Sequence, residues 1–235
     1  MDRNYFRHEF KFFINYFEYI NLKNKLKNCM QRDSNSNIDG HYHIRSLYFD
    51  DYKNSCLFEK QSGILTRKKY RIRIYNKNDD LIKLEKKSRV SNFIKKESSK
   101  INLELYYDIL LNKYIKLSKI KNKLLNEFYC DLQSYVFRPK VIVDYYREAF
   151  IWQPNNVRIT FDKKLKSGLN AIDIFSKFNS VSINEDNKLI MEIKYDHYLP
   201  NFIKNIISFD SHERYAISKY VLCRKHNKYN SWEDN

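Results

Sequence analysis

The stretch KYRIRIY, residues 69–75, decides the fold of this chain. A β-strand places alternate side chains on opposite faces, so Arg71 and Arg73 share one face here. The tyrosine and isoleucines between them share the other face and supply the apolar surface that packs on a core. The pattern therefore predicts a strand with arginines on its second face.

The same alternation of charged and apolar residues recurs along the chain. It appears in residues 7–13 (RHEFKFF), 81–88 (LIKLEKKS), 143–150 (VDYYREAF), 156–162 (NVRITFD) and 189–196 (LIMEIKYD). The strands that we expect are residues 5–13, 42–50, 69–75, 81–88, 93–97, 139–146, 156–163 and 188–195. The turn-like residues 76–80 join two of these segments into a predicted hairpin. An antiparallel sheet follows from these segments.

Helical spacing of apolar residues is confined to a few segments. The main one is residues 102–135, and shorter ones are expected within residues 17–30, 51–63, 202–208 and 218–228. There is no internal repeat and no linker long enough to divide the chain. We therefore predict one α+β domain over residues 1–235, with a helical insert at about 102–135.

The composition adds a large positive charge. The 235 residues carry a formal net charge of +16 and 16% aromatic residues, which argues for a folded protein. With only 3 glycines, a collagen and a glycine-rich nucleotide loop are excluded. The charge predicts a polyanionic partner: nucleic acid, an anionic membrane, or phosphates held in a site.

The cysteines and the apolar runs indicate the cellular compartment of the protein. The 4 cysteines form no CxxC pair and do not cluster with histidine at zinc spacing. The first residues lack the apolar region of a signal peptide, and no run reaches the about 18 apolar residues of a membrane span. These features predict a soluble, cytoplasmic protein without a membrane segment.

The charged strand faces can be interpreted in two ways. An ordinary sheet would expose them to solvent. However, arginine, which recognises phosphate with paired N–H groups, stands in mid-strand at Arg71, Arg73, Arg147 and Arg158. The second interpretation is a closed antiparallel β-barrel of about eight strands, with a charged tunnel and helices packed outside. Such a barrel has room for a small ligand, so it could hold polyphosphate.

The order of the motifs resembles one known family. RHEFKFF, SLYFDD, KYRIRIY, LEKKS, YYREAF with VRITFD, MEIKYD and SKY follow one another as in the catalytic domain of the vacuolar transporter chaperone (VTC) family. That family belongs to the CYTH or triphosphate tunnel metalloenzyme superfamily, and the match runs from about Arg7 to about Tyr220. The resemblance implies a barrel with a tunnel. It also implies an enzyme that adds the terminal phosphate of ATP to inorganic polyphosphate with Mn²⁺ or Mg²⁺.

The resemblance also assigns residues by position. The implied catalytic residues, all of them cationic, are Lys11, Arg71, Arg73, Lys87, Arg147, Arg158 and Lys219. The implied substrate-binding residues are Lys95, Tyr145, Lys194 and Ser218, and the implied metal ligand is Glu192. Glu97 departs from the pattern because an arginine is common at this position, and Lys95 would supply the neighbouring lysine.

Two other activities stay open on the sequence. Water in place of the polyphosphate end would make the enzyme an inorganic triphosphatase or nucleoside triphosphatase. Binding without turnover would make it a polyphosphate binder. The resemblance favours ATP and polyphosphate over nucleic acid as partners, and it leaves the oligomeric state open.

Overall fold

The computed structural model describes residues 7–91, 93–183 and 188–229. The chain divides into two compact units. Unit 1 comprises Met1–His43, Tyr145–Leu165 and Asn184–Ser218, and unit 2 comprises Ile44–Asp144, Lys166–Ile183 and Lys219–Asn235. Each unit is described separately, and the single domain predicted for residues 1–235 stays a prediction.

Unit 1 is built on four neighbouring antiparallel strands in the order β1–β10–β8–β7. Their bounds are β1 (Arg7–Ile14), β10 (Leu189–Asp196), β8 (Val157–Ser167) and β7 (Arg138–Trp152), with the short β2 (Gln31–Arg32) on β7. Strands β7 and β8 extend from this unit into unit 2. The strands predicted at 156–163 and 188–195 are confirmed, as is the described part of the strand predicted at 5–13, of which residues 5 and 6 lie outside the described residues. β7 is longer than the strand predicted at 139–146.

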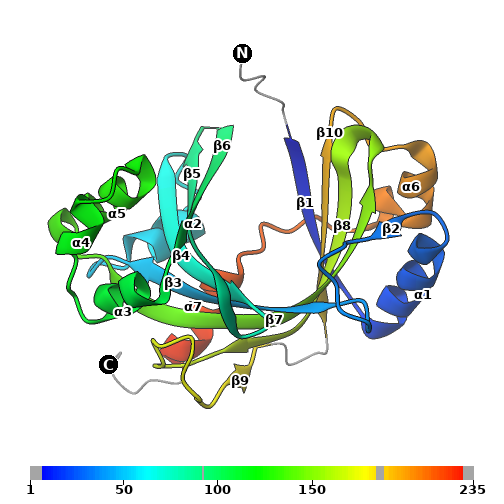
Figure 1. Cartoon of the computed structure of the whole chain (residues 1–235). Coiled ribbons are helices and arrows are strands. Elements are labelled where there is room, and N and C mark those ends of the chain that lie inside the picture. Colours follow the sequence, from blue (N-terminus) through cyan, green and yellow to red (C-terminus); the bar gives the residue numbers. More distant parts are fainter. Residues whose placement is uncertain (1–6, 92, 184–187, 230–235) are drawn as a thin grey trace. The chain divides into compact units, whose positions relative to one another are not determined.

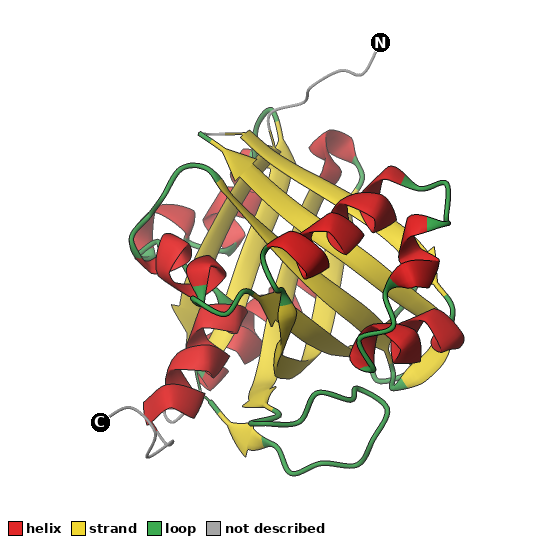
Figure 2. Ribbon diagram, turned by 90° about the vertical axis from the view of Figure 1, so that its left-hand side faces the viewer, coloured by secondary structure: helices red, strands yellow, loops and turns green. Residues whose placement is uncertain are grey.

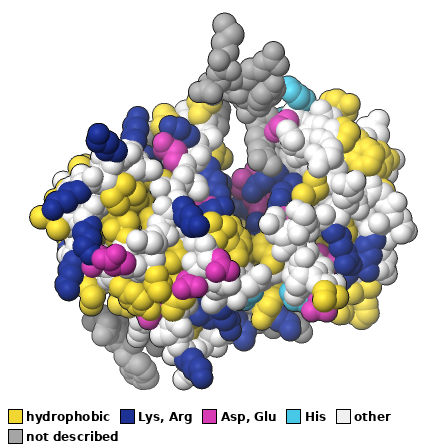
Figure 3. Space-filling model, in the orientation of Figure 1, with side chains coloured by type: hydrophobic (Ala, Val, Ile, Leu, Met, Phe, Trp, Pro, Cys, Tyr) yellow, Lys and Arg dark blue, Asp and Glu magenta, His cyan; other side chains and the backbone are white. Residues whose placement is uncertain are grey.

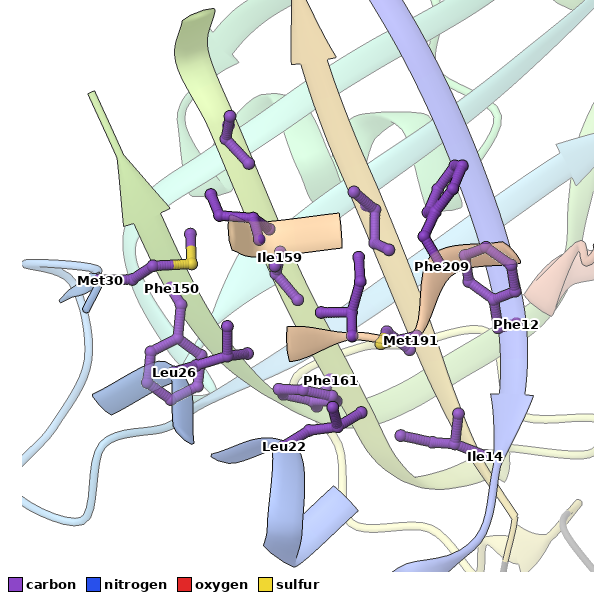
Figure 4. Close-up of a cluster of buried hydrophobic side chains, with 14 of the residues drawn as sticks. Phe12, Ile14, Leu22, Leu26, Met30, Phe150, Ile159, Phe161, Met191 and Phe209 are labelled. Atoms are coloured by element: carbon purple, nitrogen blue, oxygen red, sulfur yellow. The ribbon is translucent and has the colours of Figure 1, made fainter. Parts of the chain in front are cut away.

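Helices cover the apolar face of these strands. They are α1 (Tyr16–Lys27) and α6 (Asn201–Ile206), which lie beside β8 and β10 in Figure 1. A short 3-10 helix, Phe209–Ser211, follows α6. Figure 4 shows Phe12 of β1, Met191 of β10 and Phe161 of β8 pointing into one cluster with Leu22 and Leu26 of α1. This core occupies one face, so the charged residues of the same strands lie on the other.

Unit 2 carries the remaining strands. In sheet order they are β3 (Tyr42–Asp50), β4 (Arg67–Tyr75), β5 (Asn78–Val90) and β6 (Phe93–Ile101), and the short β9 (Val181–Ser182) pairs with β8. Asn76 and Lys77, both at positive φ, form the two-residue turn between β4 and β5. That turn explains why the hairpin is tighter than the five-residue turn predicted from sequence.

The predicted helical insert consists of three helices of unit 2. They are α3 (Leu103–Leu110), α4 (Ile115–Ser118) and α5 (Lys123–Ser134). Figure 2 shows helices lying across the strands on this side of the molecule. Phe128 of α5 is fully buried and packs on Tyr70 of β4, with ring centroids 4.9 Å apart. Two more helices, α2 (Ser55–Gln61) and α7 (Lys219–Tyr229), also belong to unit 2.

The strand pairing corrects the prediction of a closed barrel. The path of paired strands starts at β1 and ends at β6, and within the described residues no backbone pairing joins these two strands. Strand β6 is exposed along most of its length and carries three lysines, which is typical of an edge strand that is kept from pairing further. The α+β class and the helices outside the sheet are confirmed. No helix of the described residues is long and apolar enough to cross a membrane.

Candidate functional site

Each unit carries one set of charged side chains on the strand face that points away from its apolar core. We call the set on β4, β5 and β6 of unit 2 the basic face. It consists of Lys69, Arg71, Arg73, Lys83, Glu85, Lys87, Lys96 and Lys100. The set in unit 1 is called the mixed face. It consists of Glu9, Lys11, Arg147, Arg158, Asp162, Glu192 and Lys194.

Strand register arranges the basic face in rows. Arg71 lies opposite Glu85, and the next row joins Arg73, Lys83 and Lys100. On the other side of Arg71, Lys69 lies opposite Lys87, which pairs with Lys96. Residues two apart on a strand are about 6.6 Å apart, so the rows repeat at that spacing. Within these rows Glu85 is the single acid.

Glu85 holds the arginine pair in place. Its Oε2 accepts from Arg71 Nε at 2.6 Å and lies 3.8 Å from Arg73 Nη1, while its Oε1 lies 2.5 Å from Lys96 Nζ. Burial by itself would raise the pKa of Glu85, but Arg71, Arg73 and Lys96 outweigh it and hold the pKa far below its usual range. The carboxylate is therefore ionised at neutral pH, and it balances only part of the positive charge.

Lys69 of the basic face is a partly buried cation with other cations near it. Burial is the main reason why the pKa of Lys69 is lowered to about 8. Nearby cations, Lys60 and Arg67, lower it further, whereas Tyr48 acts in the opposite direction. A bound anion would relieve this, because it offsets charge that the protein's own carboxylates leave unbalanced.

The mixed face has a different balance. Lys11 Nζ lies 3.0 Å from Glu9 Oε1, and Lys194 Nζ lies 3.0 Å from Glu192 Oε1. Arg147 binds Asp162 with two hydrogen bonds of 2.7 Å and lies 3.5 Å from Glu192. Acids and bases alternate here, so most charge is neutralised within the face.

Burial and ion pairing compete at the two lysines of this face. Burial lowers the pKa of both lysines. At Lys11 the attraction of Glu192 and Glu9 outweighs burial and the pKa is raised, whereas at Lys194 burial outweighs the same two carboxylates and the pKa is lowered. The carboxylates of Glu9 and Glu192 are thus shared among several cations.

A metal ion would find few protein ligands on this face. Among the described residues no group of three or more histidine, cysteine, aspartate or glutamate side chains is placed to hold one. However, the hydroxyl of Thr160 is buried without a hydrogen-bond partner, and Thr160 lies opposite Glu192 in the register. One carboxylate beside one orphaned hydroxyl fits a hard ion such as Mg²⁺ or Mn²⁺, whose remaining ligands are water and phosphate.

The structure distributes the predicted site residues over both units. Unit 1 holds Lys11, Tyr145, Arg147, Arg158, Glu192, Lys194 and Ser218, and unit 2 holds Arg71, Arg73, Lys87, Lys95 and Lys219. Lys11 Nζ donates to the carbonyl oxygen of Ile217 at 3.3 Å, which brings the residue before Ser218 to the mixed face. In unit 2, the positive charge of Lys219 contributes to lowering the pKa of Tyr48.

Lys95 lies away from the arginine pair. The family resemblance assigns it to substrate binding, and in the structure its Nζ lies 3.0 Å from Glu97, while Glu97 in turn lies 3.5 Å from Lys86. Side chains alternate along β6, so Lys95 and Glu97 lie on the helix-covered face and Lys96 lies on the basic face. Glu97 lies on the helix-covered face as well, so an acid at this position does not replace a phosphate-binding side chain of the basic face.

Several residues of the two faces were missed as site residues from the sequence. Lys69 and Lys96 follow from the alternation once the register is known. Asp33 gave no signal, because it stands in a polar loop. The structure places it against Arg158, which also donates to Tyr42 Oη at 3.0 Å.

Many other lysines lie away from both faces. Figure 3 shows dark-blue Lys and Arg side chains spread over the surface at its left, where the helical insert lies. In the helical insert, Lys116 of α4 lies 2.6 Å from Glu104 and 2.8 Å from Asp108. These side chains form a solvated surface, and they account for part of the net charge.

Comparison with known proteins gives one family and one fold. The model of the VTC domain matches residues 6–226 of the chain. No curated protein matches it. Two solved structures are similar. A candidate adenylyl cyclase from Hippeastrum, described as having a dominant triphosphatase activity, has a TM-score of 0.55 and 14% identity over 94% of this chain and 96% of its own. A candidate adenylate cyclase from Bacillus halodurans has a TM-score of 0.52 and 12% identity over 89% and 92%.

Proposed function

This chain belongs to the VTC domain family, and from that premise we propose that it transfers the terminal phosphate of ATP to a growing inorganic polyphosphate chain. The observation that carries the proposal is the basic face, where rows of lysine and arginine follow β4 with Glu85 as their single acid. Such an excess of cations suits a ligand with one negative charge on every phosphate.

The proposed role of the arginine pair, Arg71 and Arg73, is phosphate binding. Arg73 is 6% exposed, so its charge is largely removed from water and is offset only in part by Glu85. Arginine presents N–H groups in a fixed fork that matches phosphate oxygens. We assign Arg71 and Arg73, with Lys87, Lys96 and Lys219, to phosphate binding in unit 2.

We assign the binding of a divalent metal ion to the mixed face of unit 1. Glu192 and the Thr160 hydroxyl would hold a divalent ion, and a bound Mn²⁺ or Mg²⁺ supplies neutralisation of phosphate charge. Lys11, Arg147, Arg158 and Lys194 add positive charge near this position, and Tyr145 and Ser218 complete the set by family resemblance.

The proposed step needs positioning more than acid–base chemistry. A terminal oxygen of polyphosphate attacks the γ-phosphorus of ATP, the bond from that phosphorus to the β–γ bridging oxygen breaks, and ADP leaves. The attacking oxygen is already anionic, so no protein base has to remove a proton. Fixed cations that stabilise the charge of the transition state are the main requirement.

A triphosphatase is the second candidate. The same cations would stabilise attack by water on a terminal phosphate, and the similar protein from Hippeastrum is described as having a dominant triphosphatase activity. The two candidates differ only in the acceptor, so products separate them.

The test is an analysis of products after the purified protein is incubated with ATP and Mn²⁺ or Mg²⁺. Long phosphate chains on a denaturing gel, matched by ADP, are expected. Release of inorganic phosphate from ATP or tripolyphosphate without chain growth would show the hydrolase instead. Binding of polyphosphate without either product would leave only a binder.

Matched variants connect either activity with the mixed face. Glu192→Gln keeps the size of the side chain and removes its charge, so turnover should fall at least about 100-fold. Lys86→Gln is the control on the opposite face of β5, where Lys86 lies 3.5 Å from Glu97, and it should retain turnover. Equal loss in both variants would refute the assignment of Glu192.

A further inference from the structure

The hydroxyl groups of β3 lie directly opposite the two arginines of the basic face. In the register of β3 with β4, Tyr48 lies opposite Arg71 and Ser46 lies opposite Arg73. Residues two apart on a strand point to the same face, so both hydroxyls stand beside the arginines rather than in the helix-covered core. The two rows that contain Arg71 and Arg73 thus each begin with a hydroxyl of β3.

Arg71 is held from two sides. Its Nη1 donates to Tyr48 Oη at 2.8 Å, and on the other side Nε and Nη2 both lie 2.6 Å from Glu85 Oε2. A guanidinium bound along one edge alone can still turn about its last side-chain bonds. Contacts on both sides fix the plane of the group, as substrate-binding side chains require.

Arg73 is held in a related way. Its Nε donates to Ser46 Oγ at 3.1 Å, and its Nη1 lies 3.8 Å from Glu85 Oε2. Glu85 therefore touches both arginines, while each arginine has a hydroxyl of its own. A carboxylate neutralises charge when it binds a guanidinium, whereas a neutral hydroxyl orients the guanidinium without removing its charge.

We propose that Tyr48 and Ser46 are positioning residues that orient Arg71 and Arg73 for phosphate. This inference rests on the proposed function, in which the two arginines bind phosphate, and it goes beyond the residues that the family resemblance assigns. Without the hydroxyls, the guanidinium groups lose these neutral contacts, while Glu85 still binds them.

The simpler interpretation is that Tyr48 is a buried core residue. Its ring lies 5.2 Å from the ring of Tyr220, and Tyr48 is 9% exposed. A core residue would affect stability, and its loss would change phosphate binding equally whether or not Arg71 is present. A positioning residue acts through Arg71, so its effect depends on that side chain.

The charges around Tyr48 give a second readout. Arg71 and Arg73 face it from β4, with Lys69 next to them, and Lys219 and Tyr220 face it from α7. Burial would raise the pKa of Tyr48, but Arg71, Arg73 and Lys219 lower it to about 8. The phenolate that forms above that pH offsets part of the arginine charge, so phosphate binding should weaken.

The experiment is titration calorimetry with sodium tripolyphosphate on the full chain, without nucleotide or metal. Tyr48→Phe, Arg71→Ala and the double variant form a double-mutant cycle. Loss of a hydrogen bond to a charged group should weaken tripolyphosphate binding about tenfold in Tyr48→Phe. In the Arg71→Ala background the same change should have an effect of less than about twofold.

A tyrosine on the same strand provides the matched control. Tyr70 of β4 is fully buried and donates to Asp131 at 2.6 Å, on the opposite face from the arginines. Tyr70→Phe should lower the unfolding temperature and leave tripolyphosphate affinity unchanged. If Tyr48→Phe does not fold, Ser46→Ala in a cycle with Arg73→Ala tests the same inference.

The possible outcomes separate this inference from the proposed function. If Arg71→Ala weakens binding but Tyr48→Phe does not, or if the two effects add, the positioning role falls and the phosphate role of Arg71 stands. If Arg71→Ala leaves affinity unchanged, both the positioning role of Tyr48 and the phosphate-binding role of Arg71 are refuted. Between pH 7 and 9, wild-type affinity should decrease more than that of Tyr48→Phe. Lys69 loses its proton in both proteins, so an equal decrease would count against a role of Tyr48.

Discussion

Lys95 and Lys96 are neighbours in the sequence, yet they bind carboxylates on opposite faces of β6. Lys96 Nζ lies 2.5 Å from Glu85 Oε1 on the basic face, and Lys95 Nζ lies 3.0 Å from Glu97 on the helix-covered face. These two lysines of one strand are both more than half exposed, yet their side chains lie on opposite faces of the sheet.

This difference provides the first prediction. Lys96→Ala should weaken tripolyphosphate binding several-fold, because it removes a cation from the rows that contain the arginine pair. Lys95→Ala should change affinity by less than about twofold. Calorimetry at constant ionic strength measures both, since part of the effect is screened by salt. A larger loss for Lys95→Ala would show that the assignment of faces is wrong.

Thr160 should contribute to metal binding. Its hydroxyl is buried without a hydrogen-bond partner opposite Glu192, and Thr160→Val keeps the shape while it removes the oxygen. We expect Mn²⁺ affinity, measured by electron paramagnetic resonance of the free ion, to fall about threefold to tenfold. Thr160→Ser restores a hydroxyl and should restore affinity. Unchanged affinity in Thr160→Val would remove Thr160 from the site.

Lys69 should destabilise the fold at neutral pH. Its pKa is lowered to about 8 in the folded protein from an ordinary value of 10.5, so the charged form is disfavoured by folding. That penalty is complete below pH 8, shrinks as the pH rises from 8 to 10.5, and is absent above. After allowance for partial exposure, Lys69→Met should raise the free energy of unfolding at pH 7 by about 1–2 kcal/mol.

Two measurements check this prediction about Lys69. Urea unfolding should show the gain of Lys69→Met at pH 7 and its loss near pH 10. Tripolyphosphate affinity should fall in the same variant, since the unfavourable charge is the one that a bound anion offsets. A variant that is less stable at pH 7 would contradict the prediction.

Phosphate and metal should protect different strands. The basic face carries the excess of cations, whereas the carboxylates of the mixed face include Glu192. Hydrogen exchange with tripolyphosphate alone should therefore slow mainly in β3, β4 and β5. Exchange with Mn²⁺ alone should slow mainly in β8 and β10. Protection of the same peptides by both ligands would argue against this division.

The sequence predicted most strands and helices because their patterns are local. β3 begins and ends at the residues predicted, 42–50, and the apolar positions of KYRIRIY lie in the core as expected. The short strands β2 and β9 were missed, since two residues carry no periodicity. The helical insert was predicted as one stretch, and it proved to be three helices.

The candidate site was predictable to a smaller extent. Alternation alone places Arg71 with Arg73 and Glu192 with Lys194, because it needs only the strand itself. The pairing of strands is a long-range property, and it brings Tyr48 to Arg71 and Asp33 to Arg158. No spacing in the sequence indicates either contact.

The sequence by itself determined the family, the strand pattern and the kind of charge on each strand. Tertiary structure decided which charges meet. A shift of one residue in the β5–β6 pairing would exchange the faces of Lys95 and Lys96, because side chains alternate with a period of two. The register that the folded sheet adopts therefore decides which lysine faces the arginines, and the order of residues alone does not.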